Sequence, residues 1–167
     1  MRGAVIAGLV LALAAPLPAA AEFVAREKSF KCLLDGQHVE GRKFFIFDRN
    51  RKRLHKALRV AQRNEPGKRY PVGTILQLLP FEAMVKRGGG FNPAGDGWEF
   101  FRLAVTPQGT RIVQRGGAEV ANVAGSCQGC HGAAAGFDFV CEGHGAQALP
   151  LSDDTIRALQ ASDPRCK

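Results

Sequence analysis

WEFFRLAVTPQGTRIVQ, residues 98–114, decides the fold, because it holds two strand-like runs joined by a turn. Residues 98–105 and 110–114 are rich in β-branched and aromatic side chains, which is typical of strands. Between them, TPQG at residues 106–109 supplies a proline that presets φ and a glycine that accepts a positive φ. The stretch therefore predicts a β-hairpin.

The rest of the chain adds further strands and helices around this hairpin. Residues 74–79 (TILQLL) are typical of a strand, and residues 43–47 (KFFIF) of a buried strand or the start of a helix. Residues 50–64 place apolar side chains at helical spacing among Arg and Lys, and residues 153–160 follow a serine that can cap a short helix. We therefore predict the fold class α+β, an antiparallel β-sheet domain with flanking helices.

The first 21 residues are typical of a secretory signal peptide, with Arg2, an apolar run at residues 4–15 and small residues at 19–21. The apolar run is shorter than the ~20 residues that a helix needs to span a bilayer. We expect cleavage after Ala21, export to the periplasm, no membrane span in the mature chain, and a single domain over residues 22–167.

The chain is basic, with 23 Lys and Arg against 15 Asp and Glu. Much of the excess lies in DRNRKRLHKALRVAQR, residues 48–63. Such a stretch indicates either an acidic partner, for example an acidic redox protein, or a solvated helix face. We expect no nucleic acid as partner, because the chain is expected to be exported and no aromatic residue lies among the basic ones to stack bases.

Cys127–His131 reads CQGCH, the C-x-x-C-H pattern of covalent haem attachment. Two cysteines three residues apart can form thioethers to the two vinyl groups of a haem, and the histidine that follows can ligate the iron. Export suits this chemistry, since c-type attachment is made outside the cytoplasm in bacteria. We therefore expect one covalent haem c, held by Cys127 and Cys130, with His131 as axial iron ligand.

Two other chemistries compete for these cysteines. Cys127, Cys130, Cys141 and His144 could together form a tetrahedral zinc site, although that site would leave His131 unexplained. A redox disulfide of the thioredoxin kind would join the cysteines at 127 and 130, but the chain lacks the βαβ pattern in which that motif occurs.

Three cysteines remain beyond the C-x-x-C-H pattern: Cys32, Cys141 and Cys166. Export favours a disulfide between two of them. We expect Cys141 to pair with Cys166, which would tie the C-terminal helix to the haem segment. Cys32 with Cys166 is the alternative.

The second face of the haem iron decides between electron transfer and ligand chemistry. The candidates for a sixth ligand are Met84, His38, His55 and His144. A lone methionine among apolar neighbours, as at position 84, is more typical of a core. We expect an open face lined by apolar residues, which favours neutral diatomic ligands such as NO because it offers no hydrogen bond or charge to a polar ligand.

Four short motifs occur in order along residues 70–140. They are YPVGTI at 70–75, MVK at 84–86, GWEF at 97–100, and C-x-x-C-H followed by DFV at 138–140. Their order and spacing resemble the cytochrome P-460 family, which includes the cytochromes called c-prime-beta. The resemblance implies an exported, β-rich, usually homodimeric protein with one high-spin c-type haem whose distal face is open to a gas or nitrogen-oxide ligand.

Enzymes of that family oxidise hydroxylamine, and their haem is cross-linked to a lysine a few residues beyond the G-T of the first motif. Gln77 and Leu78 stand at that place here, while Lys86 matches another family position and is expected to face solvent or to pair with an acid. This departure favours the branch without the cross-link, in which an apolar pocket binds NO or CO. For the haem pocket we expect Leu78, Phe81 and Phe100, and we note that Phe100 and Phe101 cannot share one face of a strand.

The sequence thus predicts a periplasmic mono-haem c-type cytochrome that binds or slowly converts small ligands such as NO. Three alternatives stay open: an enzyme that oxidises hydroxylamine with a modified haem, an electron-transfer cytochrome c with Met84 or a histidine as sixth ligand, and a zinc-binding module.

Overall fold

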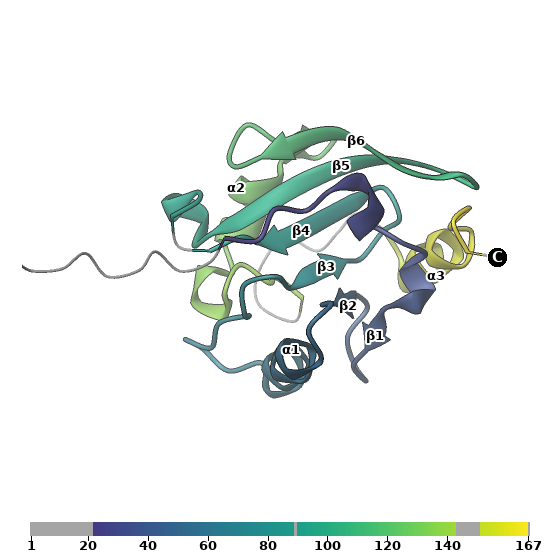
Figure 1. Ribbon diagram of the computed structural model, residues 1–167. Coiled ribbons are helices and arrows are strands. Elements are labelled where there is room, and N and C mark those ends of the chain that lie inside the picture. Colours follow the sequence, from purple (N-terminus) through teal and green to yellow (C-terminus); the bar gives the residue numbers. More distant parts are fainter. Residues whose placement is uncertain (1–21, 89, 143–150, 167) are drawn as a thin grey trace, which may run out of the picture.

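The computed structural model describes residues 22–88, 90–142 and 151–166 (Figure 1). The predicted signal peptide, residues 1–21, and His144 lie outside these residues. Over the part of the chain that is described, no helix has both the length and the apolar character needed to cross a membrane.

Among the described residues, six strands form one antiparallel sheet in which spatial order follows chain order (Figure 1). They are β1 (Gln37–His38), β2 (Phe45–Phe47), β3 (Ile75–Gln77), β4 (Glu82–Lys86), β5 (Trp98–Thr106) and β6 (Gly109–Gly116). The opening stretch forms β5 and β6, and Thr106 pairs directly with Gly109 at the predicted turn. The predicted hairpin and the α+β class with an antiparallel sheet are confirmed.

The sequence analysis assigned no strand to residues 82–86, yet β4 lies between β3 and β5. Its last four residues are all buried, including Lys86. A strand that is covered on both faces lacks the alternation of apolar and polar residues by which strands are usually recognised.

In the part of the chain that the structure describes, three α-helices and one small hairpin flank the sheet. They are α1 (Arg51–Arg63), α2 (Cys127–Gly132) and α3 (Asp153–Ala161), with the hairpin of β7 (Ala121–Asn122) and β8 (Gly125–Ser126). The side chain of Asn50 accepts a hydrogen bond from the Arg53 amide and caps α1, and Ser152 caps α3 through the Thr155 amide. Both predicted helices are therefore confirmed.

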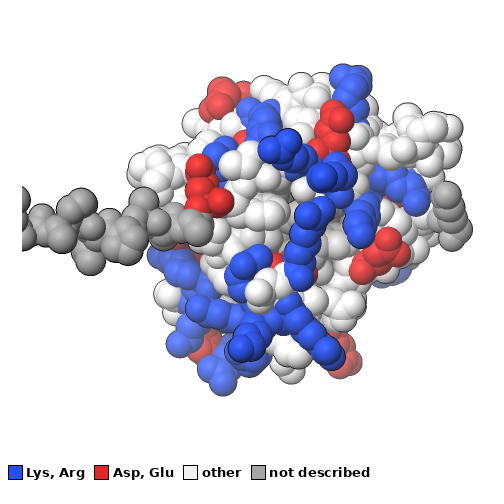
Figure 2. Space-filling model, viewed as in Figure 1, with Lys and Arg blue, Asp and Glu red and all other residues white. Residues whose placement is uncertain are grey.

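Basic side chains line the outer surface of α1. Lys52, Lys56, Arg59 and Arg63 are exposed and recur every three or four residues, so they share one side of the helix. Figure 2 shows Lys and Arg gathered at the bottom of the view, where Figure 1 places α1. The acidic partner that the charge indicates stays a prediction.

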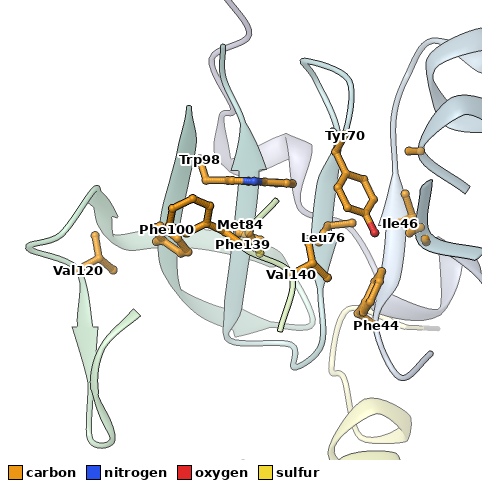
Figure 3. Close-up of a cluster of buried hydrophobic side chains, with 12 residues drawn as sticks. Phe44, Ile46, Tyr70, Leu76, Met84, Trp98, Phe100, Val120, Phe139 and Val140 are labelled. Atoms are coloured by element: carbon orange, nitrogen blue, oxygen red, sulfur yellow. The ribbon is translucent and has the colours of Figure 1, made fainter. Parts of the chain in front are cut away.

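The sheet buries side chains on both faces, and β5 contributes side chains to each of them. Trp98 and Phe100 point to one face and pack in the first cluster (Figure 3). Phe101 points to the other face and packs in the second cluster with Phe30 and Val85. Phe100 and Phe101 are 2% and 1% exposed, so the two phenylalanines divide between the faces as the strand alternation predicted.

Different segments cover the two faces. We call the face with Phe100 the motif face, because α1 and the segment of α2 cover it; its buried residues are Phe44, Ile46, Ala57, Ala61, Tyr70, Leu76, Met84, Trp98, Phe100, Val120, Phe139 and Val140. The N-terminal segment covers the opposite face and contributes Ala25 and Phe30 to the second cluster. It contains the 3-10 turns η1 (Glu27–Ser29) and η2 (Leu33–Asp35).

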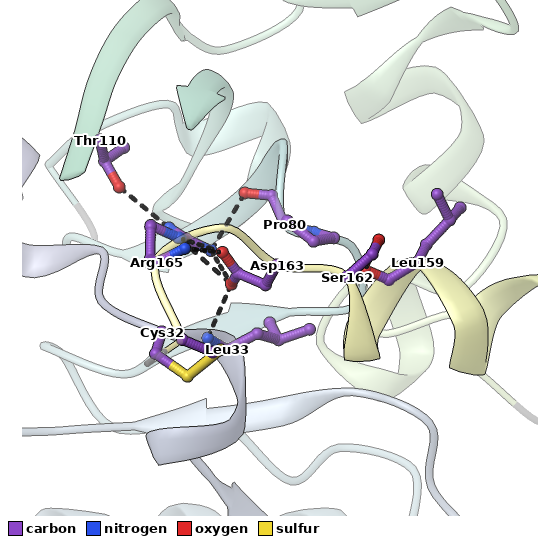
Figure 4. The surroundings of a disulfide bond; sticks show 9 residues. Cys32, Leu33, Pro80, Thr110, Leu159, Ser162, Asp163 and Arg165 are labelled. Carbon is purple, nitrogen blue, oxygen red and sulfur yellow. Dashed lines mark hydrogen bonds and ion pairs between the residues drawn. A yellow bond between two sulfur atoms is a disulfide. The ribbon is translucent and has the colours of Figure 1, made fainter. Parts of the chain in front are cut away.

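The disulfide joins Cys32 to Cys166, so the predicted pair of Cys141 with Cys166 is wrong and the alternative is confirmed. The cause is a buried ion pair that holds the C-terminus against the N-terminal segment (Figure 4). Asp163 Oδ2 lies 2.6 Å from Arg165 Nη2 and also accepts a hydrogen bond from the Leu33 amide at 2.8 Å. This anchor brings residue 166 beside residue 32, while Cys141 stays free.

Candidate functional site at the C-x-x-C-H helix

The short helix α2 carries the whole C-x-x-C-H pattern. Ser126 caps it, because the Ser126 hydroxyl accepts a hydrogen bond from the Gly129 amide at 3.2 Å. The Cys127 amide donates to the Val120 carbonyl at 2.9 Å, which ties the helix start to the chain that precedes β7. Cys127 packs against the first cluster and Cys130 is exposed, and both thiols are free.

The imidazole of His131 makes its polar contacts through Nδ1. Nδ1 lies 2.6 Å from the carbonyl oxygen of Phe139 and 3.2 Å from Sγ of Cys141. A carbonyl oxygen can only accept, so Nδ1 must carry the proton and donate it. In a neutral ring the lone pair then lies on Nε2, the atom through which a histidine oriented in this way binds a metal.

Burial keeps this ring neutral. It lowers the pKa of His131 below the ordinary value, and the hydrogen bond to the Phe139 carbonyl only partly opposes that shift. Burial also raises the pKa of Cys141 to about 11, with a smaller contribution from the nearby Cys130 thiol. At neutral pH the structure therefore places a neutral imidazole beside a protonated thiol.

Two of the three predicted pocket residues lie on the motif face. The Phe100 ring is centred 5.3 Å from the His131 ring, so it packs against the histidine. Leu78 is half-buried and packs against the first cluster. Phe81 is 39% exposed and lies at the rim of a surface hollow.

Gln77 and Leu78, which stand where the family resemblance implies a cross-linking lysine, point to different faces of the sheet. Gln77 shares its face of β3 with Ile75, which belongs to the second cluster, and is 1% exposed. Leu78 instead packs against the first cluster, as Cys127 does. Leu78 therefore lies on the motif face, whereas Gln77 points to the opposite face.

Two charged residues, Glu82 and Arg102, lie near Cys127 and are not predicted as site residues from the sequence. Glu82 and Arg102 pair across β4 and β5, and both influence the pKa of the Cys127 thiol, which burial raises. Together with Asn122 and Phe81 they line a hollow of about 270 Å³. Alternation along β4 and β5 would have placed them on the motif face with Met84 and Phe100, had β4 been recognised.

Asp138 lies at the centre of a buried charge network that follows α2. Its carboxylate is 0% exposed; Oδ2 accepts the Tyr70 amide at 2.7 Å, and Oδ1 lies 2.5 Å from Lys86 Nζ. Lys86 Nζ also donates to the Asp96 carbonyl at 2.6 Å. The expectation that Lys86 faces solvent or pairs with an acid is settled in favour of the acid. The sequence analysis used Asp138 only as part of the DFV motif.

The competing ligand sets are not assembled within the described residues. No group of three or more His, Cys, Asp or Glu side chains there is placed to hold a metal ion, and the predicted zinc ligand His144 falls outside them. Met84 is buried opposite Leu76 and Phe100. His38 packs against Phe45, and His55 is exposed on α1.

Comparisons with protein-family models, with curated proteins and with solved structures find no match for this chain. The resemblance to the cytochrome P-460 family therefore stays a prediction from the motifs, as do the homodimer and the periplasmic location. The function is inferred from α2, the segment that follows it, and the sheet face beneath them.

Proposed function

We propose that this chain is a c-type haem protein in which Cys127 and Cys130 form the thioethers and His131 ligates the iron through Nε2. The observation that carries the proposal is the hydrogen bond from His131 Nδ1 to the Phe139 carbonyl, at 2.6 Å. It fixes the ring tautomer that a metal-binding histidine needs, and such a second partner is typical of histidine ligands.

The donor set fits a haem c on further grounds. Both thiols of the C-x-x-C pair are free and lie three residues apart on one helix, as double thioether attachment requires. The ring of Phe100 supports one side of the His131 ring. Cys127 and apolar Leu78 both pack against the first cluster, so a large apolar group bound there would replace water over an apolar surface.

A haem held in this way would supply an iron that binds small ligands at its second face. We propose that this face is open and that the ligand is a neutral diatomic such as NO. Among the described candidates for a sixth ligand, Met84 is 6% exposed within the first cluster, His38 packs on Phe45, and His55 is exposed on α1. The protein would then be a ligand binder or slow converter, similar to the cytochromes c-prime-beta, rather than an electron carrier.

The arrangement of lysines favours the branch without a cross-linked haem. Gln77 and Leu78 stand where the family resemblance implies a lysine, and Leu78, the one on the motif face, offers no nucleophile. Lys86 is buried and pairs with Asp138 through Nζ, so its amine is already used in the fold. The hydroxylamine-oxidising alternative would need another residue to form the cross-link.

Expression of the full chain in a bacterium that carries c-type cytochrome maturation tests the proposal. The purified protein should keep its haem after denaturation and show the pyridine haemochrome spectrum of a double thioether. The double variant Cys127→Ala/Cys130→Ala should lose this haem, whereas Cys141→Ala should retain it. Colourless wild-type protein that purifies with one zinc ion would contradict the haem proposal.

The state of the second iron face is tested on the same protein. The ferrous form should be high-spin and should bind CO and NO, with Met84→Leu behaving as the wild type. A six-coordinate low-spin ferrous spectrum that CO does not change would refute the open face. If that low-spin spectrum were lost in Met84→Leu, Met84 would be the sixth ligand and the electron-transfer alternative would be favoured.

A further inference from the structure

The carbonyl that orients His131 belongs to an unusual piece of backbone. Asp138 and Phe139 are consecutive non-glycine residues with φ of 56° and 62°, in the left-handed region. L-residues reach this region at a cost in free energy, so the surrounding contacts must hold them there. The Phe139 amide donates to the Ala134 carbonyl at 3.0 Å, and the Val140 amide, in the same peptide group as the Phe139 carbonyl, donates to the Phe137 carbonyl at 3.2 Å. These two bonds shape the turn from within its own segment.

The Asp138 carboxylate ties this turn to more distant parts of the chain. Oδ2 receives the Tyr70 amide from the chain leading into β3, and Oδ1 receives Nζ of Lys86 from β4. The strained pair is thereby fastened to β4 and to the chain before β3, and the Phe139 side chain is buried in the first cluster. Lys86 is fixed in turn by the carbonyl and carboxylate of Asp96, at 2.6 and 3.1 Å.

We propose that Asp138 is a positioning residue for His131: by fastening the left-handed turn to Lys86 and Tyr70 it aims the Phe139 carbonyl at Nδ1. The consequence for an iron bound at Nε2 rests on the proposed function. A strong Nδ1–H···O=C bond makes the imidazole a better electron donor, so the Asp138 network would set the donor strength of the ligand without touching it.

The chain offers a matched control in Asp163. This second buried aspartate is 3% exposed, accepts the Leu33 amide and pairs with buried Arg165, yet it lies at the Cys32–Cys166 disulfide. Asp138→Asn and Asp163→Asn should therefore both lower stability. Only Asp138→Asn should disturb His131.

Two readouts follow His131 itself. In haem-free protein, ¹⁵N-edited NMR should show a slowly exchanging Nδ1 proton in the wild type and in Asp163→Asn, and its loss in Asp138→Asn. In haem-loaded ferrous protein, resonance Raman should show the iron–histidine stretch at lower frequency in Asp138→Asn than in the other two. Lys86→Gln, which keeps a donor for Asp138 but removes the charge, should give a smaller shift in the same direction.

The outcomes separate this inference from the proposed function. If Asp138→Asn folds and leaves both signals as in the wild type, or if Asp163→Asn changes them equally, Asp138 is not a positioning residue. If Asp138→Asn does not accumulate, Lys86→Gln decides by the same signals. A wild-type chain that takes up no haem overturns the proposed function, while the NMR readout still tests the positioning of His131.

Discussion

Asp163 and Asp138 are both buried aspartates that accept a backbone amide and pair with a buried cation, yet they anchor different kinds of segment. The anchor at Asp163 ends in the Cys32–Cys166 disulfide, so its reactive groups are consumed. The anchor at Asp138 leads to His131, whose Nε2 has no recorded partner among the described residues, and to the free thiols of Cys127, Cys130 and Cys141. One anchor thus ends in a disulfide, whereas the other lies beside free thiols and a histidine with a ring nitrogen that is free among the described residues, which is why the proposed haem site is placed there.

The largest expected effect comes from removing the nearest cation of one buried aspartate. Lys86→Met should lower the free energy of unfolding by about 3–5 kcal/mol, because Asp138 would stay buried with Arg69 Nε, at 3.9 Å, as its nearest remaining cation. Urea denaturation measures the change. Lys43→Met is the control, since the Lys43–Asp153 pair is exposed to solvent and should contribute little to stability. Equal losses in the two variants would show that Asp138 is not held as described.

Removing the Cys32–Cys166 disulfide should have the next largest effect on the free energy of unfolding. Cys32→Ala/Cys166→Ala should cost about 2–5 kcal/mol, because the disulfide links residues 134 positions apart. The same variant should still attach haem, since the disulfide lies away from α2. Peptide mapping of the oxidised wild type should show residue 32 linked to residue 166. A bridge that includes Cys141 would contradict the comparison between the anchors.

Substituting two neighbouring phenylalanines tests the difference between the two faces of the sheet, with a smaller loss of stability. Phe100→Leu and Phe101→Leu should each destabilise by about 1 kcal/mol, because both side chains are buried and the change is nearly volume-conserving. Only Phe100 packs on the His131 ring, so only Phe100→Leu should move the His131 NMR signals of the haem-free chain. Equal shifts in both variants would mean that the motif face is not distinct from the opposite face.

The smallest expected effect is the pH dependence that His131 contributes. Its folded-state pKa is lowered by burial, so protons bind the unfolded chain more readily. The haem-free protein should lose stability as pH falls below the unfolded value of about 6.5, and His131→Gln should remove this part of the loss. An NMR titration of the ring checks the direction: a pKa above 6.5 would be the opposite result.

Local patterns predicted the local structure. The hairpin of residues 98–114 and the helices α1 and α3 follow from turn chemistry, capping residues and apolar spacing, all of which lie within short windows of sequence. β4 was missed because it is buried on both faces and therefore shows no alternation.

The site was predicted only where its residues are adjacent in the chain. The sequence identified Cys127, Cys130 and His131 as one group, and the structure adds that Nδ1 is the engaged nitrogen. The sequence alone could not show whether Gln77 or Leu78 lies on the motif face, because that depends on the register of β3. Nor could it find the link from Asp138 to Lys86, or the disulfide, since both join residues far apart in sequence.

The most direct test of haem attachment is the mass of the proteolytic peptide that contains Cys127–His131, taken from protein matured with haem. This peptide alone should carry the mass of one haem, attached through both cysteines and absent from Cys127→Ala/Cys130→Ala. An unmodified peptide with two free thiols, from cells that attach haem to a control cytochrome c, would contradict the proposed haem attachment.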